Sequence, residues 1–441
     1  MIRSGKAFLV TLLIATGAPA QSGGNFTITQ STVANGGGPV AGGSFTVQGT
    51  TGQPAAGTQM NNSPYSEFGG FWTEFVTPTA AAGSIVGQVV DADGNPLEGV
   101  AVRLAGTQTR LAMTDARGTF SFSNVEANGF YVVTPARPNF NFAPTQRSFT
   151  QLGAETEAVF TARAASNLVN PLADTDYFVR QQYVDFLNRE PDESGLAFWI
   201  NNIASCGSDQ GCVTTKRVDT SAAFFLSIEF AQTGYLVERF YKVAYGDAIG
   251  NSTIGGPHQL AVPVIRFNEF LQDTQRIGRG VVVLASGWQQ LLQSNTQAFA
   301  GEFVQRPGFV NAFPISMTPA EFVDRLNQNA GSVLSATERD AAIGLFGGAA
   351  DTKSISARAL AVRQISDNPQ LLKAELNRAF VLAEYFGYLR RNPNDRPEPT
   401  LDYSGYDFWL TKLNQFGGNY GNAEMVNAFL SSIEYQRRFT L

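Results

Sequence analysis

The sequence predicts a multidomain β + α protein. It would have an N-terminal glycine-rich β segment, a β-sandwich of the seven-strand type and a C-terminal all-α region with an internal repeat. Three observations predict this class. Alternating apolar and polar runs, separated by turn residues, fill residues 84–163. From residue 164 onward, apolar residues recur every three or four positions, as in helices. One aromatic motif occurs twice in that last part.

Composition excludes several classes of function. Charged residues make up 15% of the 441 residues, the formal net charge is −6, and His258 is the single histidine. An acidic chain offers no general attraction to phosphate backbones, so we expect no nucleic-acid partner. A single histidine excludes sites that need two, and we expect neither a metal nor another cofactor. No later run of about 20 apolar residues predicts a membrane span.

The first segment, residues 1–20, is typical of a secretory signal peptide. Arg3 and Lys6 precede an apolar stretch at residues 7–15, and Ala18-Pro19-Ala20 fits the pattern of a cleavage site. The alternative is a buried N-terminal helix. The signal predicts a secreted protein that is extracellular or at the cell surface.

The two cysteines agree with export. Cys206 and Cys212 lie in the segment Cys-Gly-Ser-Asp-Gln-Gly-Cys, and an oxidising compartment would allow them to pair across this short loop. Free thiols are the main alternative. A metal site would need more ligands than these two cysteines and the distant His258 supply. We therefore predict a disulfide.

Residues 21–83 form the glycine-rich β segment and linker. Short period-two alternation at residues 26–29 and 44–48 predicts strands, and residues 77–83 have the composition of a linker. Such short strands form a small sheet or a flexible spacer, because few strands alone are marginally stable.

Residues 84–163 predict the β-sandwich. Period-two alternation and turn residues place strands at residues 84–90, 100–104, 119–122, 130–133, 147–150 and 157–161. The first turn contains Asp91, Asp93 and Asn95, whose oxygens are candidate calcium ligands. We favour a plain turn, because the segment lacks the later glutamate of an EF-hand loop.

This segment resembles the carboxypeptidase regulatory-like domain. The matching residues are Gly87-x-Val89-x-Asp91, Gly94-x-Pro96-Leu97-x-Gly99-Val100-x-Val102-x-Leu104, Thr114-Asp115-x-x-Gly118-x-Phe120-x-Phe122 and Gly129-x-Tyr131-x-Val133. The resemblance implies a transthyretin-like sandwich. It also implies a spacer or folding partner, in some cases carbohydrate-binding-like, without catalytic residues of its own.

The helical part divides into module 1 at residues 164–245, a helical insertion or diverged copy at residues 246–373, and module 2 at residues 374–441. In module 1, Asp192 is the predicted N-cap of a helix whose apolar face consists of Leu196, Trp199, Ile200 and Ile203. A long helical stretch is expected from residue 213 to about residue 230, and its continuation over residues 235–245 is also expected to be helical.

The two modules share three segments in the same order. Tyr183–Pro191 recurs as Tyr385–Pro393, Ser194–Ile200 as Ser404–Leu410, and Ala223–Phe230 as Ala428–Tyr435. The first copy resembles the bacterial family described as domain of unknown function 4214, through the pattern Tyr-x-x-Phe-Leu-x-Arg-x-Pro-Asp-x-x-Gly-Leu-x-Phe-Trp. The second copy departs from it, because residues 394–403 lengthen the turn and Tyr406 replaces leucine. The resemblance implies an exported or surface protein and no established reaction.

The repeated aromatic residues have two interpretations. Packing is favoured, because two neighbouring helical residues cover a wide arc and at least one of them must face inward. The alternative is a sugar platform, for which Trp199, Tyr406 and Trp409 are the candidate glycan contacts. We also expect Arg189 and Arg391 to bond helix-terminal carbonyls or a carboxylate in their own module, and Gly195 and Gly405 to allow close helix contact.

These observations predict a secreted modular protein without catalytic activity. Its role would be structural, adhesive or carbohydrate-contacting, with an extracellular glycan or an envelope component as partner. The alternative is a glycan-degrading enzyme that uses carboxylates in the helical region. No spacing in the sequence selects a pair of carboxylates, because the separation that matters is spatial.

Overall fold

The computed structural model describes residues 82–150, 152, 156–166 and 170–440, together with six short strands between residues 22 and 67. The predicted signal segment, residues 1–20, lies outside the described residues. The chain divides into two units, Met1–Ala80 and Ala81–Leu441.

The first unit contains three antiparallel pairs of strands. β1 (Ser22–Gly23) pairs with β2 (Phe26–Thr27), β3 (Gly36–Gly42) with β4 (Phe45–Thr51), and β5 (Met60–Asn62) with β6 (Tyr65–Glu67). The predicted glycine-rich β segment is therefore confirmed.

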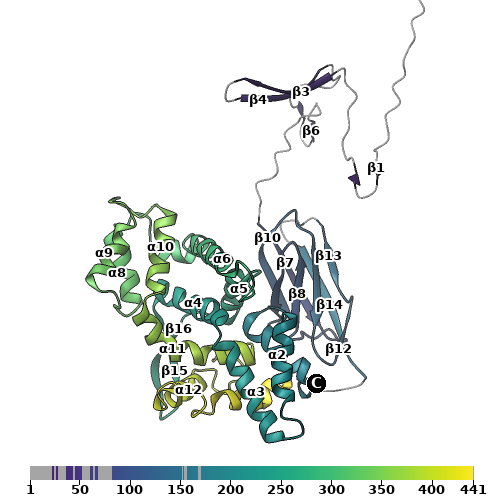
Figure 1. The fold of residues 1–441 in the computed structure, drawn as a ribbon, viewed down its shortest axis with the longest axis vertical. Helices are drawn as coiled ribbons and strands as arrows, with labels where there is room; N and C mark the ends of the chain where they lie inside the picture. Colours follow the sequence, from purple (N-terminus) through teal and green to yellow (C-terminus); the bar gives the residue numbers. More distant parts are fainter. Residues whose placement is uncertain are drawn as a thin grey trace, which may run out of the picture. The chain divides into compact units, whose positions relative to one another are not determined.

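The second unit begins with a sandwich of two four-stranded sheets (Figure 1). One sheet has the order β10-β7-β14-β12 and the other β13-β11-β8-β9, and β14 pairs with β7 in parallel. The strands are β7 (Ala82–Val90), β8 (Ala101–Gly106), β9 (Arg110–Met113), β10 (Thr119–Glu126), β11 (Tyr131–Ala136), β12 (Phe140–Ala143), β13 (Arg147–Phe149) and β14 (Thr156–Ala164).

The predicted sandwich is confirmed, with eight strands where a seven-strand type is expected. The strands that the sequence does not reveal are β9 and β12. Each has only four residues, and β9 buries only Ala112, so its sequence shows no clear apolar alternation; β12 alternates Phe140 and Phe142 with exposed residues but is too short to stand out. The core between the sheets contains Val89, Phe122 and Phe160, all buried.

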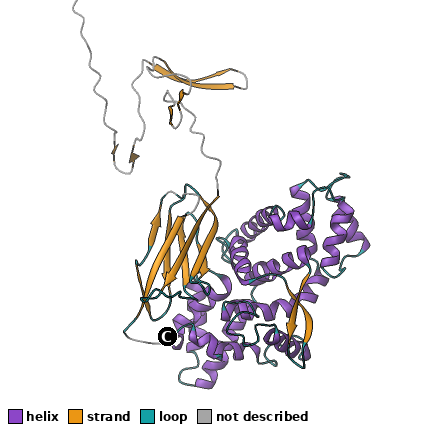
Figure 2. Cartoon of the chain, turned by 180° about the vertical axis from the view of Figure 1, so that it is seen from behind, coloured by secondary structure: helices purple, strands orange, loops and turns teal. Residues whose placement is uncertain are grey.

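The rest of this unit is mainly helical (Figure 2). Its helices and helical turns are η1 (Pro171–Ala173), α1 (Thr175–Gln182), η2 (Tyr183–Leu187), α2 (Glu193–Ala204), α3 (Gln210–Phe225), α4 (Ile228–Tyr245), α5 (Phe267–Gly278), α6 (Trp288–Phe303), α7 (Pro307–Ala312), α8 (Pro319–Asn329), α9 (Ala336–Gly344), α10 (Ile355–Ser366), α11 (Pro369–Glu384), η3 (Tyr385–Leu389), α12 (Ser404–Gln415), α13 (Met425–Ser431) and α14 (Ile433–Arg437). In both views, α8 and α9 lie on the side of this region away from the sandwich.

Two details of the helical prediction are wrong. The region is not purely helical, because β15 (Asp247–Ser252) and β16 (His258–Pro263) form an antiparallel hairpin. His258 begins β16 and lies 3.0 Å from Asp407 on α12, so module 2 anchors the hairpin. The long helical stretch is also interrupted between α3 and α4, where the Ser227 side chain accepts a hydrogen bond from the backbone N–H of Phe230 and caps α4.

Direct hydrogen bonds join the sandwich to the helical region. β9 is an edge strand, and the side-chain amide of Gln275 on α5 bonds both the N–H and the carbonyl of Leu111. Ser123 on β10 donates to Gln272 at 3.2 Å, and Asn139 donates to the carbonyl of Phe439 at 2.8 Å. Helix α5 thus satisfies backbone groups that an uncovered edge would leave open.

Candidate functional site

The two repeats fold alike at their shared motif. α1 ends in the π-helical turn η2 and α11 in the equivalent turn η3. Each turn stops at a residue in the left-handed conformation, Asn188 with φ 54° and Arg390 with φ 56°. The repeat found in the sequence is therefore also a repeat of local structure.

The repeated arginines bind carboxylates of their own module, as predicted. Arg189 donates two hydrogen bonds to Glu229, at 2.7 and 2.8 Å, and lies over the ring of Tyr183. Arg391 makes the same two-pronged contact with Glu434, at 2.9 Å for Nη2, and lies over the ring of Tyr385. This fork geometry fixes the start of α4 and α14 against the π-helical turns.

The repeated glycines allow close contact, also as predicted. A Cβ added at Gly195 would overlap the hydroxyl of Tyr183, and one added at Gly405 would overlap the hydroxyl of Tyr385. The tyrosine of each motif therefore lies directly against the first turn of the following helix.

The two modules pack against each other through these turns. The ring of Phe186 in η2 meets the ring of Tyr388 in η3 edge-on, with centroids 4.9 Å apart. The Tyr388 hydroxyl contacts Ser221, and the Tyr435 hydroxyl accepts from Gln182 at 3.3 Å. We call this contact the inter-module seam.

The candidate glycan contacts differ in how far they are exposed to solvent. In each Phe-Trp pair the tryptophan packs against the core, Trp199 beside Phe224 and Trp409 beside Phe429, and both remain partly exposed. The preceding phenylalanine points outward: Phe198 is 60% exposed and Phe408 45%.

The prediction that Tyr406 contacts a glycan is wrong. Its side chain is fully buried, and its hydroxyl donates to the carbonyl of Arg378 at 3.3 Å. A glycan cannot reach it. The exposed aromatic residue of this pair, which the sequence did not single out, is Phe198. The helical period could have found it, since Phe198 lies off the apolar face formed by Leu196, Trp199, Ile200 and Ile203.

An apolar groove of about 730 Å³ lies at Phe198 and Trp199. The C-terminal end of α3 and the start of α4 contribute Phe224 and Ile228, and the loop 282–285 forms another wall. We call this the Phe198 groove. Two carboxylates line it, Asp192 and Glu229.

Both carboxylates of the Phe198 groove are engaged by the protein. Asp192 caps α2 by accepting from the backbone N–H of Gly195 and the hydroxyl of Ser194, each at 2.8 Å. The Gly195 bond and then the Ser194 bond lower the pKa of Asp192. Both oxygens of Glu229 accept from Arg189. Neither group is thus available as a proton donor to a ligand.

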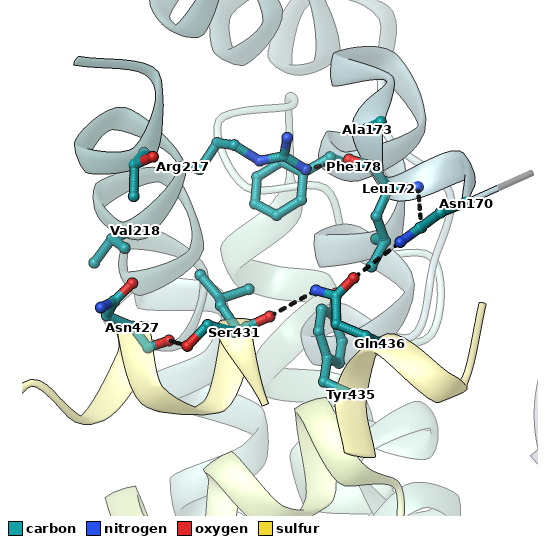
Figure 3. A pocket seen from close by; sticks show the side chains of 12 residues that line it. Asn170, Leu172, Ala173, Phe178, Arg217, Val218, Asn427, Ser431, Tyr435 and Gln436 are labelled. Atoms are coloured by element: carbon teal, nitrogen blue, oxygen red, sulfur yellow. Dashed lines mark hydrogen bonds between the residues drawn. The ribbon is translucent and has the colours of Figure 1, made fainter. Parts of the chain in front are cut away.

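A second groove, of about 310 Å³, lies where the two modules meet near η1 (Figure 3). Its polar side chains bond to the protein. Asn170 donates to Gln436, which donates to the carbonyl of Leu430, and Arg217 donates to the carbonyl of Leu172 while lying over the ring of Phe178. Because these side chains already form hydrogen bonds within the protein, they are not free to bond a ligand in this groove.

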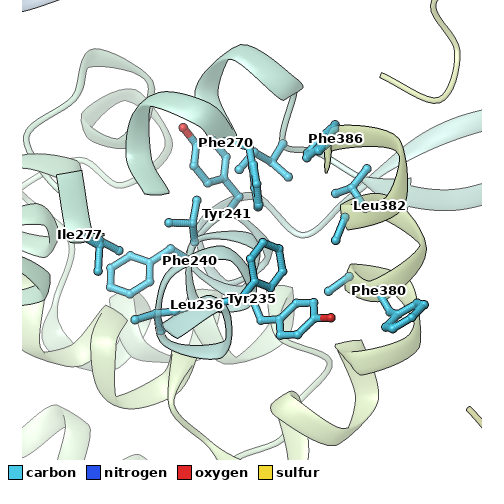
Figure 4. Packing of buried hydrophobic residues seen from close by; sticks show 14 of the residues in the cluster. Tyr235, Leu236, Phe240, Tyr241, Phe270, Ile277, Phe380, Leu382 and Phe386 are labelled. Carbon is cyan, nitrogen blue, oxygen red and sulfur yellow. The ribbon is translucent and has the colours of Figure 1, made fainter. Parts of the chain in front are cut away.

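Figure 4 shows the buried apolar side chains that pack around α4 and α11. The carboxyls whose pKa is raised most, Glu238 on α4 and Glu384 on α11, are buried in this helical region. Glu238 is 3% exposed and Glu375 4%. Lys242 and Arg378 each pair with Asp247, at 2.8 and 2.6 Å, and both also approach Glu375, at 3.7 and 3.3 Å. Lys242 and Arg378 thus pair with Asp247 and Glu375, and Glu238 lies near Arg378, Arg239 and Lys242. Burial first, and then Glu375, raise the pKa of Glu238 to about 8.

This buried acid predicts a pH effect on stability. The folded state holds the proton of Glu238 more tightly than the unfolded state, whose ordinary pKa is 4.5, so this group lowers the free energy of unfolding as pH rises from about 5 to 8. The neutral variant Glu238→Gln should gain stability relative to wild type over that window, measured by chemical denaturation at pH 5, 6, 7 and 8. The exposed variant Glu193→Gln serves as the control. A difference between Glu238→Gln and wild type that does not change with pH would contradict this account.

The candidate calcium ligands form a turn. Asp91 accepts hydrogen bonds from the backbone N–H of Asp93 at 2.9 Å and of Asn95 at 2.8 Å, and from the Asn95 side chain at 3.0 Å. The Asn95 bonds are the main reason that the pKa of Asp91 is lowered. This is the geometry of the plain turn that the sequence favoured. Within the described parts of the chain, no group of three or more histidine, cysteine, aspartate or glutamate residues is arranged to hold a metal ion.

The predicted disulfide is present. Cys206 and Cys212 are bonded, with their Cα atoms 5.6 Å apart, and the bridge joins the end of α2 to the start of α3. Among the described helices, none combines the length and the apolar character that a membrane span requires.

Comparison with known families agrees with both resemblances. Residues 84–163 match the carboxypeptidase regulatory-like domain, and residues 158–234 match the domain of unknown function DUF4214. The second copy, at residues 374–441, lies outside these matched ranges. No curated protein matches the chain. The chain is thus a modular protein in which the two families follow one another in the predicted order.

Proposed function

We propose that this chain, a carboxypeptidase regulatory-like sandwich followed by a DUF4214-type helical region, is a secreted non-catalytic protein that contacts carbohydrate through the Phe198 groove. One observation carries the proposal: the exposed ring of Phe198 stands edge-on to the partly exposed Trp199, with centroids 4.9 Å apart, at a groove of about 730 Å³. Apolar and aromatic walls with a few polar groups are typical of small-ligand sites. The apolar face of a sugar ring can stack on such rings.

The state of the nearby carboxylates favours binding over hydrolysis. Most glycosidases need one carboxyl group with a raised pKa as proton donor and a second carboxylate across the scissile bond. In the Phe198 groove the pKa of Asp192 is lowered, and Glu229 is held by Arg189. None of the described carboxyls with a raised pKa lines this groove or the one at η1, and Glu238, Glu375 and Glu384 among them are enclosed in the helical core.

Two features support secretion. The N-terminal residues 1–20 have the charge and apolar pattern of a signal peptide, and the Cys206–Cys212 bridge suits an oxidising compartment. A secreted protein with a rigid sandwich beside the helical region would present the groove to extracellular or envelope glycans.

A glycan array with the full mature chain tests the proposal. We expect saturable binding without product release, and at least about tenfold weaker binding by Phe198→Ala. Phe416→Ala removes a ring that is 44% exposed and does not line the groove, so it should bind as wild type does. Binding that survives Phe198→Ala would overturn the proposal. Product release abolished by a single Asp or Glu substitution would favour the glycan-degrading enzyme instead.

A further inference from the structure

A cavity of about 440 Å³ lies at the junction of the sandwich and the helical region. The start of β9 provides Arg110, and the C-terminal end of α5 provides Arg276 and Arg279. Glu302 on α6 is the one carboxylate among its lining residues in the described chain. Three guanidinium groups from two domains thus converge on one space, and we call it the arginine cavity.

The carboxylates near the arginine cavity pair with Arg276 and with Arg306, which lies outside the lining. Glu302 accepts from Arg306 at 2.9 Å and from Arg276 at 2.6 Å, and both oxygens of Asp273 accept from Arg306 at 2.7 Å. Within the described residues, neither Arg110 nor Arg279 forms an ion pair with a carboxylate.

Arg110 and Arg279 instead donate to neutral carbonyl groups. Nη1 of Arg110 bonds the carbonyl of Ser123, and Nη2 of Arg279 bonds the carbonyl of Thr107 at 3.2 Å. A carbonyl orients a guanidinium group without neutralising its charge. The cavity therefore retains an excess of positive charge, with three arginines against one shared glutamate.

The geometry holds Arg110 in place. Its guanidinium carbon lies 5.6 Å from the centroid of the Phe122 ring, and the residue is partly buried. Burial first, and then the like charge of Arg276, lower the pKa of Arg110 to about 10, so the group remains charged at neutral pH. A charge that is taken out of water without a counter-ion raises the free energy of the folded state, and a bound anion would relieve that cost.

We propose that the arginine cavity binds an oxyanion group, as a carboxylate, sulfate or phosphate, through Arg110, Arg276 and Arg279. The planar fork of a guanidinium group matches two oxygens of such a group at once, which a neutral ligand cannot exploit. The neutral polar residues Gln108, Thr109, Asn124 and Asn295 also line the cavity and can bond the remainder of a ligand. Because Arg110 belongs to the sandwich and the other two arginines to α5, a bound anion also joins the two domains.

This site is independent of the proposed carbohydrate contact, because the arginine cavity and the Phe198 groove share no lining residue. Thermal unfolding and calorimetric titration of the full mature chain test it, with sulfate, phosphate and glucuronate each compared with chloride at equal ionic strength. We expect a saturable rise in the unfolding midpoint with at least one of the three anions. Binding of glucuronate alone assigns a carboxylate ligand, and binding of sulfate or phosphate alone assigns a tetrahedral one.

Three variants distinguish anion binding at the arginine cavity from a general effect of salt on stability. Arg279→Gln removes an exposed side chain and should weaken binding about tenfold, the value of one charge-assisted contact. Arg110→Gln should weaken it at least as much. Arg117→Gln removes the same charge from the exposed turn before β10 and should bind as wild type does. A midpoint that rises equally in Arg117→Gln and Arg279→Gln, or that does not differ from chloride in wild type, would overturn the proposal.

Discussion

Replacing Asp185 with alanine should lower the free energy of unfolding of the helical region by about 3–5 kcal/mol. The carboxylate of Asp185 is fully buried at the inter-module seam. It accepts from both terminal nitrogens of Arg438, at 2.8 and 3.0 Å, and lies 3.2 Å from Nη2 of Arg390. Its removal would leave two enclosed arginines without a counter-charge, which costs far more than the lost bonds alone.

Asp176→Ala is the matched control for Asp185→Ala. Asp176 lies on the preceding helix α1 and pairs with Arg180 at 2.9 Å, but both side chains are about half exposed. Exposed pairs contribute roughly 0–1 kcal/mol, so this variant should unfold close to wild type. Urea denaturation followed by tryptophan fluorescence measures both. Equal midpoints for the two variants would show that the seam does not depend on this charge.

The second large effect concerns Phe186 and Gly387, which face each other across the seam. Phe186 is 2% exposed, and a Cβ added at Gly387 would overlap its ring. Phe186→Ala should cost about 3–5 kcal/mol through the cavity that it leaves. Gly387→Ala should cost about 1–3 kcal/mol in the wild-type background through overpacking.

The combination of these two substitutions gives the sharper result. In the Phe186→Ala background the methyl group that Gly387→Ala adds has room, and alanine favours a helical turn over glycine by about 1 kcal/mol. Gly387→Ala should therefore become neutral or stabilising there, measured as a double-mutant cycle from urea denaturation.

Gly301→Ala is the control for the cycle, because Gly301 lies within α6 with nothing close to its added Cβ, and it should stabilise both backgrounds alike. Additive effects of Phe186→Ala and Gly387→Ala would mean that the two modules do not pack through these residues.

The inter-module seam explains why the repeat carries its aromatic residues. Tyr183, Phe186 and their counterparts Tyr385 and Tyr388 are all buried, and they hold each module together or join one module to the other. The outward ring of each Phe-Trp pair is not needed for this packing. The ring of Phe198 is therefore exposed, while Trp199 packs against Phe224.

Local signals in the sequence predicted much of this structure. The Asp192 N-cap and the sandwich strands depend on neighbours within a few residues. The paired roles of Arg189 and Arg391 were also predictable, because a repeated motif repeats its own internal contacts.

Other features could not be predicted because they depend on distant segments. Strand β9 is completed by Gln275, and the β15–β16 hairpin is held by Ser404 and Asp407 of module 2. Tyr406 was predicted as a surface contact, yet it is enclosed and bonded to the carbonyl of Arg378. In each case a residue more than 20 positions away decides the outcome.

The order of the domains, the class of each, the disulfide and the repeat can be predicted from the amino-acid sequence, since hydrophobic period, turn chemistry and cysteine spacing act over short stretches of chain. The folded structure is needed to know which rings are exposed, which acids are enclosed, and that three arginines from β9 and the C-terminal end of α5 share one cavity. Exposure and electrostatic environment are properties of all the groups that surround a side chain. Those groups are brought together by folding, from positions that no local pattern connects.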